Sequence, residues 1–192
     1  MGRIADAMDA IASSLQRLGH PCVALLRPPL SRDARNGLWK RLPFAPTQEL
    51  DELYEWRDGT EAPAGALLDN LHIIPGFFLM SLNEAVDVYF ERASGPQWQS
   101  NWFPFLADGA GDFYVVPCLP SSIPAAGVVG FIHGEPEQPV EYESIETMMR
   151  TFAEAYVAGA VILDEDGCLE YDDEAFRLIA QRNNPGQTIW HV

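Results

Sequence analysis

The sequence predicts an α+β fold, in which helices pack against a central antiparallel or mixed β-sheet. Segments rich in β-branched and aromatic residues gather in the middle of the chain, whereas amphipathic segments lie near both ends. Strands and helices do not alternate along the chain, as they would in a parallel α/β fold. At 192 residues, 47% of them hydrophobic, the chain is long enough to bury a core without a disulfide or metal staple.

Helices are expected throughout the first half of the chain. Residues 3–18 carry apolar side chains at spacings of three and four, which predicts an amphipathic helix. A second helix is predicted over residues 31–41. Thr47 is a suitable N-cap for a third, and Gly59 stands just beyond its end as a C-cap would. After an irregular and then extended segment, residues 81–84 form a capping box that predicts a fourth helix.

The middle of the chain is predicted to form the sheet. Residues 102–106 and 113–116 are strand-like and are expected to pair as a hairpin. The turn between them is predicted to be structural, with glycines at positive φ and aspartates hydrogen-bonded to the backbone. That turn contains Asp108, Gly109, Gly111 and Asp112. A third strand is predicted over residues 128–133, and a fourth over 139–142 at the edge of the sheet, where a proline is tolerated.

The last third of the chain predicts a helix over residues 144–158, a short hairpin, and a final helix over 173–182. The turn of the hairpin, residues 164–167, carries three acids and a glycine. A calcium loop of the EF-hand type needs its glycine at the sixth position and a glutamate at the twelfth, so a tight turn is the better interpretation. We expect residues 31–192 to form one globular domain, with residues 1–30 contributing an N-terminal helix and linker packed on it.

The charge of the chain is −16 and is unevenly distributed. Residues 1–41 carry seven basic and three acidic residues, whereas the remaining 151 residues carry five basic and 25 acidic ones. Such a body repels phosphates, so we expect no nucleic-acid partner. It attracts cationic proteins and accelerates their encounter, although the same charge also serves solubility.

The apolar stretches fall well short of the ~20 residues that a membrane-spanning helix needs, and we expect no membrane association. The N-terminal segment carries acids in its periodic region and does not resemble a signal peptide. Three widely spaced cysteines argue against a disulfide framework. These features together predict a cytoplasmic protein.

No catalytic motif stands out. Asp108 and Asp112 are conceivable as an acid/base pair, but the glycines between them favour the structural turn. The four histidines and three cysteines have no metal-ligand spacing, and no phosphate-binding glycine loop is present. We therefore expect no cofactor, no metal and no enzymatic activity.

Aromatic and acidic residues occur together near the central hairpin. Strand alternation directs about half of the aromatic rings away from one face of the sheet, and exposed rings beside carboxylates suit a basic protein partner. The alternative is that these rings fill the core. The candidate partner-binding residues are Trp98, Tyr114, Glu135, Glu137, Glu141 and Glu143.

Several segments resemble a known family in order and spacing. The first contains Leu42-Pro43 and the run Glu49-Leu50-Asp51-Glu52-Leu53-Tyr54-Glu55-Trp56-Arg57-Asp58-Gly59. The others are Phe77–Ala85, the hairpin Trp102–Asp112, the strand Gly127–His133 and the helix Ile145–Ala158. Together they resemble the SUKH superfamily, in particular the branch named for the Smi/Knr cell-wall-synthesis regulators. The resemblance covers about residues 38–160.

This resemblance implies an α+β fold and a binding function. Bacterial members of the superfamily are mostly immunity proteins that neutralise polymorphic toxins, often nucleases, and others resemble protein-interaction scaffolds. The resemblance implies no catalytic residue. We expect an immunity-type module whose acidic face binds a cationic toxin domain; the alternatives are a regulatory scaffold for a housekeeping partner and, remotely, an uncharacterised hydrolase.

Overall fold

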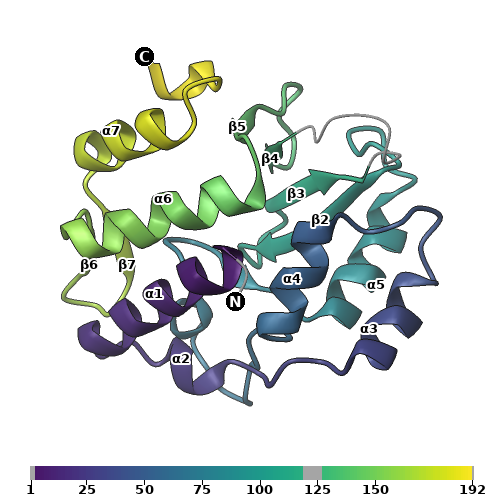
Figure 1. Cartoon of the computed structure of the whole chain (residues 1–192), viewed down its shortest axis with the longest axis horizontal. Coiled ribbons are helices and arrows are strands. Elements are labelled where there is room, and N and C mark those ends of the chain that lie inside the picture. The colour runs from purple at the N-terminus through teal and green to yellow at the C-terminus, as the bar shows by residue number, and fades with distance from the viewer. Residues whose placement is uncertain (1–2, 119–126, 192) are drawn as a thin grey trace.

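A five-stranded sheet lies at the centre of the fold, and all of its neighbouring strands are antiparallel, which confirms the α+β prediction. The computed structural model describes residues 3–118 and 127–191 (Figure 1). The strands follow one another across the sheet in chain order. They are β1 (Phe78–Leu79), β2 (Trp102–Ala107), β3 (Phe113–Pro117), β4 (Val128–Phe131) and β5 (Val140–Tyr142).

The second strand, β2, contains a proline although it lies inside the sheet. Strand β1 pairs only with Leu106 and Ala107, so Pro104 has no neighbour on that side and blocks no ladder hydrogen bond. The register of β2 against β3 shifts between Pro104 and Leu106, which leaves Phe105 as the extra residue of a bulge. Both faces of this strand are covered, because Phe103, Phe105 and Leu106 are all fully buried.

The helices surround this sheet, and most of them begin where the sequence predicts. They are α1 (Arg3–Leu18), α2 (Cys22–Leu25), α3 (Arg32–Trp39), α4 (Gln48–Trp56), α5 (Leu82–Arg92), α6 (Ile145–Ala158) and α7 (Asp173–Asn183), with two short 3₁₀ segments, η1 (Leu68–Leu71) and η2 (Thr188–His191). Hydroxyl side chains accept a hydrogen bond from the backbone N–H three residues onward at the N-caps of α3, α4, α5 and α6; the capping residues are Ser31, Thr47, Ser81 and Ser144.

The prediction for Gly59 is wrong. The C-cap of α4 is Arg57, in an extended conformation, and not a left-handed glycine. Gly59 does have a positive φ of 78°. Glycine is needed there because the backbone of Ser81 passes close by: a Cβ on residue 59 would lie 2.3 Å from the backbone nitrogen of Ser81. Its neighbour Thr60 donates its backbone N–H to Leu79 at 2.8 Å, so this segment runs directly alongside β1.

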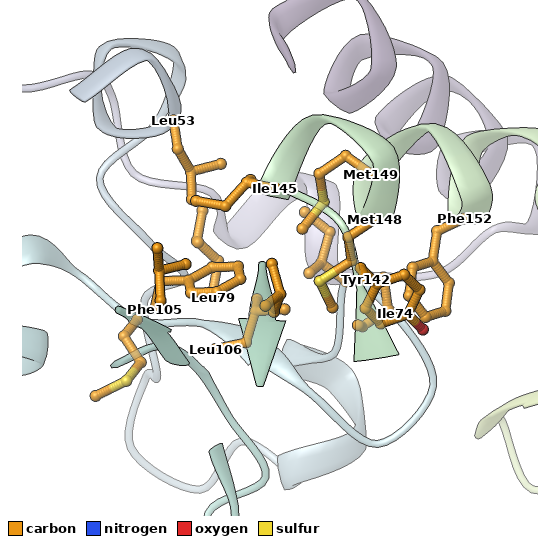
Figure 2. Close-up of a cluster of buried hydrophobic side chains, with 14 of the residues drawn as sticks. Leu53, Ile74, Leu79, Phe105, Leu106, Tyr142, Ile145, Met148, Met149 and Phe152 are labelled. Carbon is orange, nitrogen blue, oxygen red and sulfur yellow. The ribbon is translucent and has the colours of Figure 1, made fainter. Parts of the chain in front are cut away.

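Helix α1 contributes to the same hydrophobic core as the sheet. Its apolar stripe of Ile4, Met8, Ile11 and Leu15 is completely or almost completely buried. The helix packs mainly on α6 and also contacts α4. In Figure 2, Met148, Met149 and Phe152 point from α6 toward the sheet, where they meet Leu106 and Tyr142.

A separate two-stranded hairpin, formed by β6 (Val161–Leu163) and β7 (Leu169–Tyr171), follows α6. Its turn is held by Asp164, whose Oδ1 accepts from the backbone N–H groups of Asp166 and Cys168 at 2.9 and 2.7 Å. One face of the hairpin is buried through Val161 and Leu169. The other face exposes the cross-strand pair Ile162 and Glu170.

The edge strand β5 is covered by the C-terminal segment. The Trp190 Nε1–H donates to the carbonyl of Glu141 at 2.6 Å, and Asn184 Oδ1 accepts from the backbone N–H of Glu143 at 3.0 Å. These side chains satisfy backbone groups that an edge strand otherwise leaves open to another chain. Within the described part of the chain, no helix has the combined length and apolarity that a membrane crossing requires.

Candidate partner-binding surface

Trp98 is not a surface residue, so its expected place among the exposed partner-binding residues does not fit the structure. Its side chain is only 7% exposed, and its Nε1–H donates to the carbonyl of Trp102 at 3.2 Å. Its ring lies 5.0 Å from Phe131 and 5.8 Å from Phe113, measured between centroids. The alternative interpretation holds for these rings: they fill the core beside the sheet.

Tyr114 and Glu141 form a pair within the fold. The Tyr114 hydroxyl donates to Glu141 Oε2 at 2.9 Å across β3, β4 and β5, and its ring packs 4.7 Å from that of Phe77. The strand between them carries Gly130, where a Cβ would collide with the Glu141 carboxylate. Burial raises the pKa of Glu141, although the Tyr114 hydrogen bond favours its ionised form. Neither side chain is a free surface group.

The other three predicted glutamates are exposed, but they do not form one cluster. Glu135 and Glu137 lie in the loop between β4 and β5, which is braced by Gln97: its Nε2 donates to the carbonyl of Glu135 at 2.9 Å. Glu143 lies beyond the end of β5, where its Oε1 accepts from the backbone N–H of Gly186 at 2.9 Å. Of the predicted glutamates, Glu135 and Glu137 are therefore the two that are exposed in one loop.

A denser acidic surface lies on the β6–β7 hairpin and the start of α7. We call it the acidic hairpin surface; its seven acids are Asp164, Glu165, Asp166, Glu170, Asp172, Asp173 and Glu174. All but Asp164 are exposed, and none forms an ion pair with a basic side chain of the described residues. One exposed apolar side chain, Ile162 at 50%, lies beside Glu170 on the outer face of the hairpin. Tyr171 lies on the opposite face, where its ring stacks on Phe176 at 4.8 Å.

Acids elsewhere on the chain are more often engaged. Asp51 accepts hydrogen bonds from Arg35 and from the indole of Trp39, both at 3.0 Å. Asp87 pairs with Arg41 at 2.8 Å. The contrast singles out the acidic hairpin surface as a region of uncompensated negative charge.

The turn between β2 and β3 has the positive φ angles predicted for it, 84° at Gly109 and 123° at Gly111. The Oδ1 of Asp108 accepts from three backbone N–H groups, those of residues 110, 111 and 112, at 2.8–2.9 Å. Asp112 Oδ1 accepts from the backbone N–H of His133 at 2.8 Å and so fastens the turn to the end of β4. Each aspartate thus uses a carboxylate oxygen to hold the backbone.

Two of the three thiols and two of the four imidazoles are buried in the fold. Burial raises the pKa of Cys22 and of Cys118 to about 12, which keeps both as thiols near neutral pH. Burial lowers the pKa of His20 and of His72, so both are neutral there. Among residues 3–118 and 127–191, no three His, Cys, Asp or Glu side chains converge as a metal site would require.

The chain matches no protein-family model and no curated protein sequence. No matching relative therefore assigns a function to this chain.

Proposed function

We propose that this chain is a non-catalytic protein-binding module of the immunity type, which neutralises a cationic toxin domain in the cytoplasm. The observation that carries the proposal is the acidic hairpin surface, whose six exposed acids form no ion pair with a basic side chain in the part of the chain that the structure describes. The resemblance to the SUKH superfamily supports the same function.

A regulatory scaffold for a housekeeping partner is the second candidate. A hydrolase that uses Asp108 or Asp112 is a remote third, since one carboxylate oxygen of each aspartate accepts a hydrogen bond from the backbone.

The physical basis is electrostatic complementarity. A nuclease binds phosphates through basic residues, so its active face is cationic. Uncompensated carboxylates on the immunity protein attract that face and align it before contact. Ile162, beside Glu170 on the outer face of the hairpin, then supplies exposed apolar area that a partner buries, which charge alone does not provide.

The test first asks whether a neighbouring gene encodes a cationic toxin domain, and then measures the binding of that domain to this chain and the inhibition of its activity. The variant Glu165→Lys/Glu170→Lys reverses two exposed charges of the acidic hairpin surface. Its matched control is Asp33→Lys/Glu91→Lys, which reverses two exposed acids on α3 and α5 and changes the net charge equally. We expect the first variant to lose at least about tenfold in affinity, and the control to lose much less.

Equal losses in the two variants would mean that only the overall charge matters, and would remove this surface as the binding site. No binding or inhibition by the wild-type chain would count against the immunity function and favour the scaffold.

A further inference from the structure

A groove of about 780 Å³ runs over the outer face of α6, between α1 and α7. Both of these helices pack against α6 (Figure 1). The floor of the groove is small and apolar, formed by Ala7 and Ala10 of α1 and by Ala153, Val157 and Ala158 of α6. Val157 is 70% exposed, and no other large hydrophobic side chain of the described residues is more exposed.

The rim of the groove is charged but balanced. It carries three arginines and three acids: Arg3, Arg150, Arg182, Asp6, Glu146 and Glu154. Glu146 contacts Arg3 at 3.4 Å and Arg150 at 3.7 Å. Arg182 approaches Glu154 at 2.6 Å. On a chain with a net charge of −16, this is a locally neutral surface that brings together three of the twelve basic residues.

The charge pattern decides which occupant fits. An anionic small molecule finds no free cation, because each arginine of the rim already faces a carboxylate. A cationic toxin face meets three arginines here, whereas the acidic hairpin surface offers it only carboxylates. Because each rim arginine is already paired with a rim carboxylate, the occupant that fits is an apolar surface with no net charge, and the groove itself is such a surface.

We propose that two copies of this chain associate through this groove, with α1 and α6 of one copy facing those of the other. A two-fold interface brings the same surface together from both sides, so it must be complementary to itself. A rim with no net charge satisfies the electrostatic part of that condition, and alanines allow two helical surfaces to approach closely. Elsewhere two such acidic bodies repel one another, and that repulsion is least where the groove is neutral.

The test is the molar mass of the wild-type chain in solution, measured by sedimentation equilibrium over a series of concentrations from nanomolar to submillimolar. We expect the mass to rise from the 21.3 kDa of one chain toward twice that value. The variant Val157→Glu places a charge at the centre of the apolar floor. It should weaken association at least about a hundredfold, because an unpaired charge is buried in the interface.

The matched control is Leu67→Glu, at a side chain that is 68% exposed and lies outside the groove. Both variants should melt as the wild type does, and the control should still associate. A wild-type chain that stays at 21.3 kDa at every concentration, or a Val157→Glu variant that associates as well as the control, would overturn the proposal. Toxin binding is expected to survive Val157→Glu, so this result is independent of the proposed function.

Discussion

The carboxylate of Glu49 caps a helix that begins 96 residues later. Its Oε2 accepts from the backbone N–H of Ile145 at 3.0 Å, and its Oε1 accepts from that of Glu146 at 3.3 Å. These N–H groups belong to the first turn of α6 and have no partner within the helix. Burial raises the pKa of Glu49, while the two N–H groups and the positive end of the helix favour its charged form. Helix α4 is thereby fastened to α6.

Replacing Glu49 by alanine should lower the free energy of unfolding by about 1–3 kcal/mol, because two partly buried backbone donors lose a charged acceptor. Urea unfolding measures the change. The matched control is Glu52→Ala on the same helix, since Glu52 accepts only from the neighbouring Gln48. The control should change stability by less than about 0.5 kcal/mol. Equal effects in the two variants would show that the contact with α6 contributes nothing.

The parts of this fold that the sequence predicts depend on local chemistry. The N-caps at Ser81 and Ser144 and the turn at Gly109 and Gly111 are each determined within about four residues, so reading the chain locally finds them. The same holds for the alternation of strands in the middle of the chain. Local chemistry is therefore sufficient for the element order and for the fold class.

Burial and long-range contacts were harder to predict. Trp98 is buried because Phe113 and Phe131, from two later strands, close over it, and no pattern near residue 98 indicates this. The acids of residues 164–174 were visible as a charge run, but their freedom from ion pairs is a property of the folded surface. The groove over α6 depends on the packing of α1 on α6, where Arg3 meets Glu146 across 143 residues of sequence, and no sequence signal predicted it.

Gly59 should tolerate no side chain. The variant Gly59→Ala combines a positive φ of 78° with a Cβ that would lie 2.3 Å from the backbone of Ser81. We expect a loss of about 3 kcal/mol or more in the free energy of unfolding, because backbone cannot give way as a side-chain tip can. Gly65→Ala is the control: φ there is 83°, but nothing lies within 4 Å of the added Cβ. Its cost should be confined to the backbone, about 1 kcal/mol. Equal costs would mean that the close approach at Gly59 is unimportant.

His72 should make the fold sensitive to mild acid. Burial lowers its pKa below 6.5, although the carboxylates of Asp69, 3.5 Å away, and of Asp108 oppose the shift. Below pH 6.5 His72 binds a proton more readily in the unfolded chain than in the folded chain, and this difference favours unfolding. The contribution of neutral His72 to stability is therefore complete above pH 6.5 and is lost as the pH falls below 6.5. The stability advantage of the wild type over His72→Gln should therefore shrink from about pH 7.5 to about pH 5.5.

Urea unfolding at the two pH values measures this difference. The variant His133→Gln, at an exposed histidine, is the control for loss of an imidazole. Buried carboxylates with raised pKa, such as Glu49, are present in all three proteins and cancel in the comparison. The prediction is wrong if both variants show the same dependence on pH.

The acidic hairpin surface should act on a cationic toxin domain mainly by accelerating its association. Its exposed carboxylates interact with the partner over distances that salt screens, since the Debye length is about 8 Å at physiological ionic strength and about 30 Å at 0.01 M. Long-range attraction accelerates encounter, whereas contacts made after docking determine how long the complex lasts. The association rate should therefore fall about tenfold or more from low to physiological salt, while the dissociation rate changes much less. Stopped-flow mixing with the toxin domain measures both rates. Glu165→Lys/Glu170→Lys should flatten the salt dependence of association more than the control reversal of Asp33 and Glu91 does, because its two charges lie where the partner approaches. An association rate independent of salt in the wild type would leave the exposed acids of this surface with a role in solubility alone.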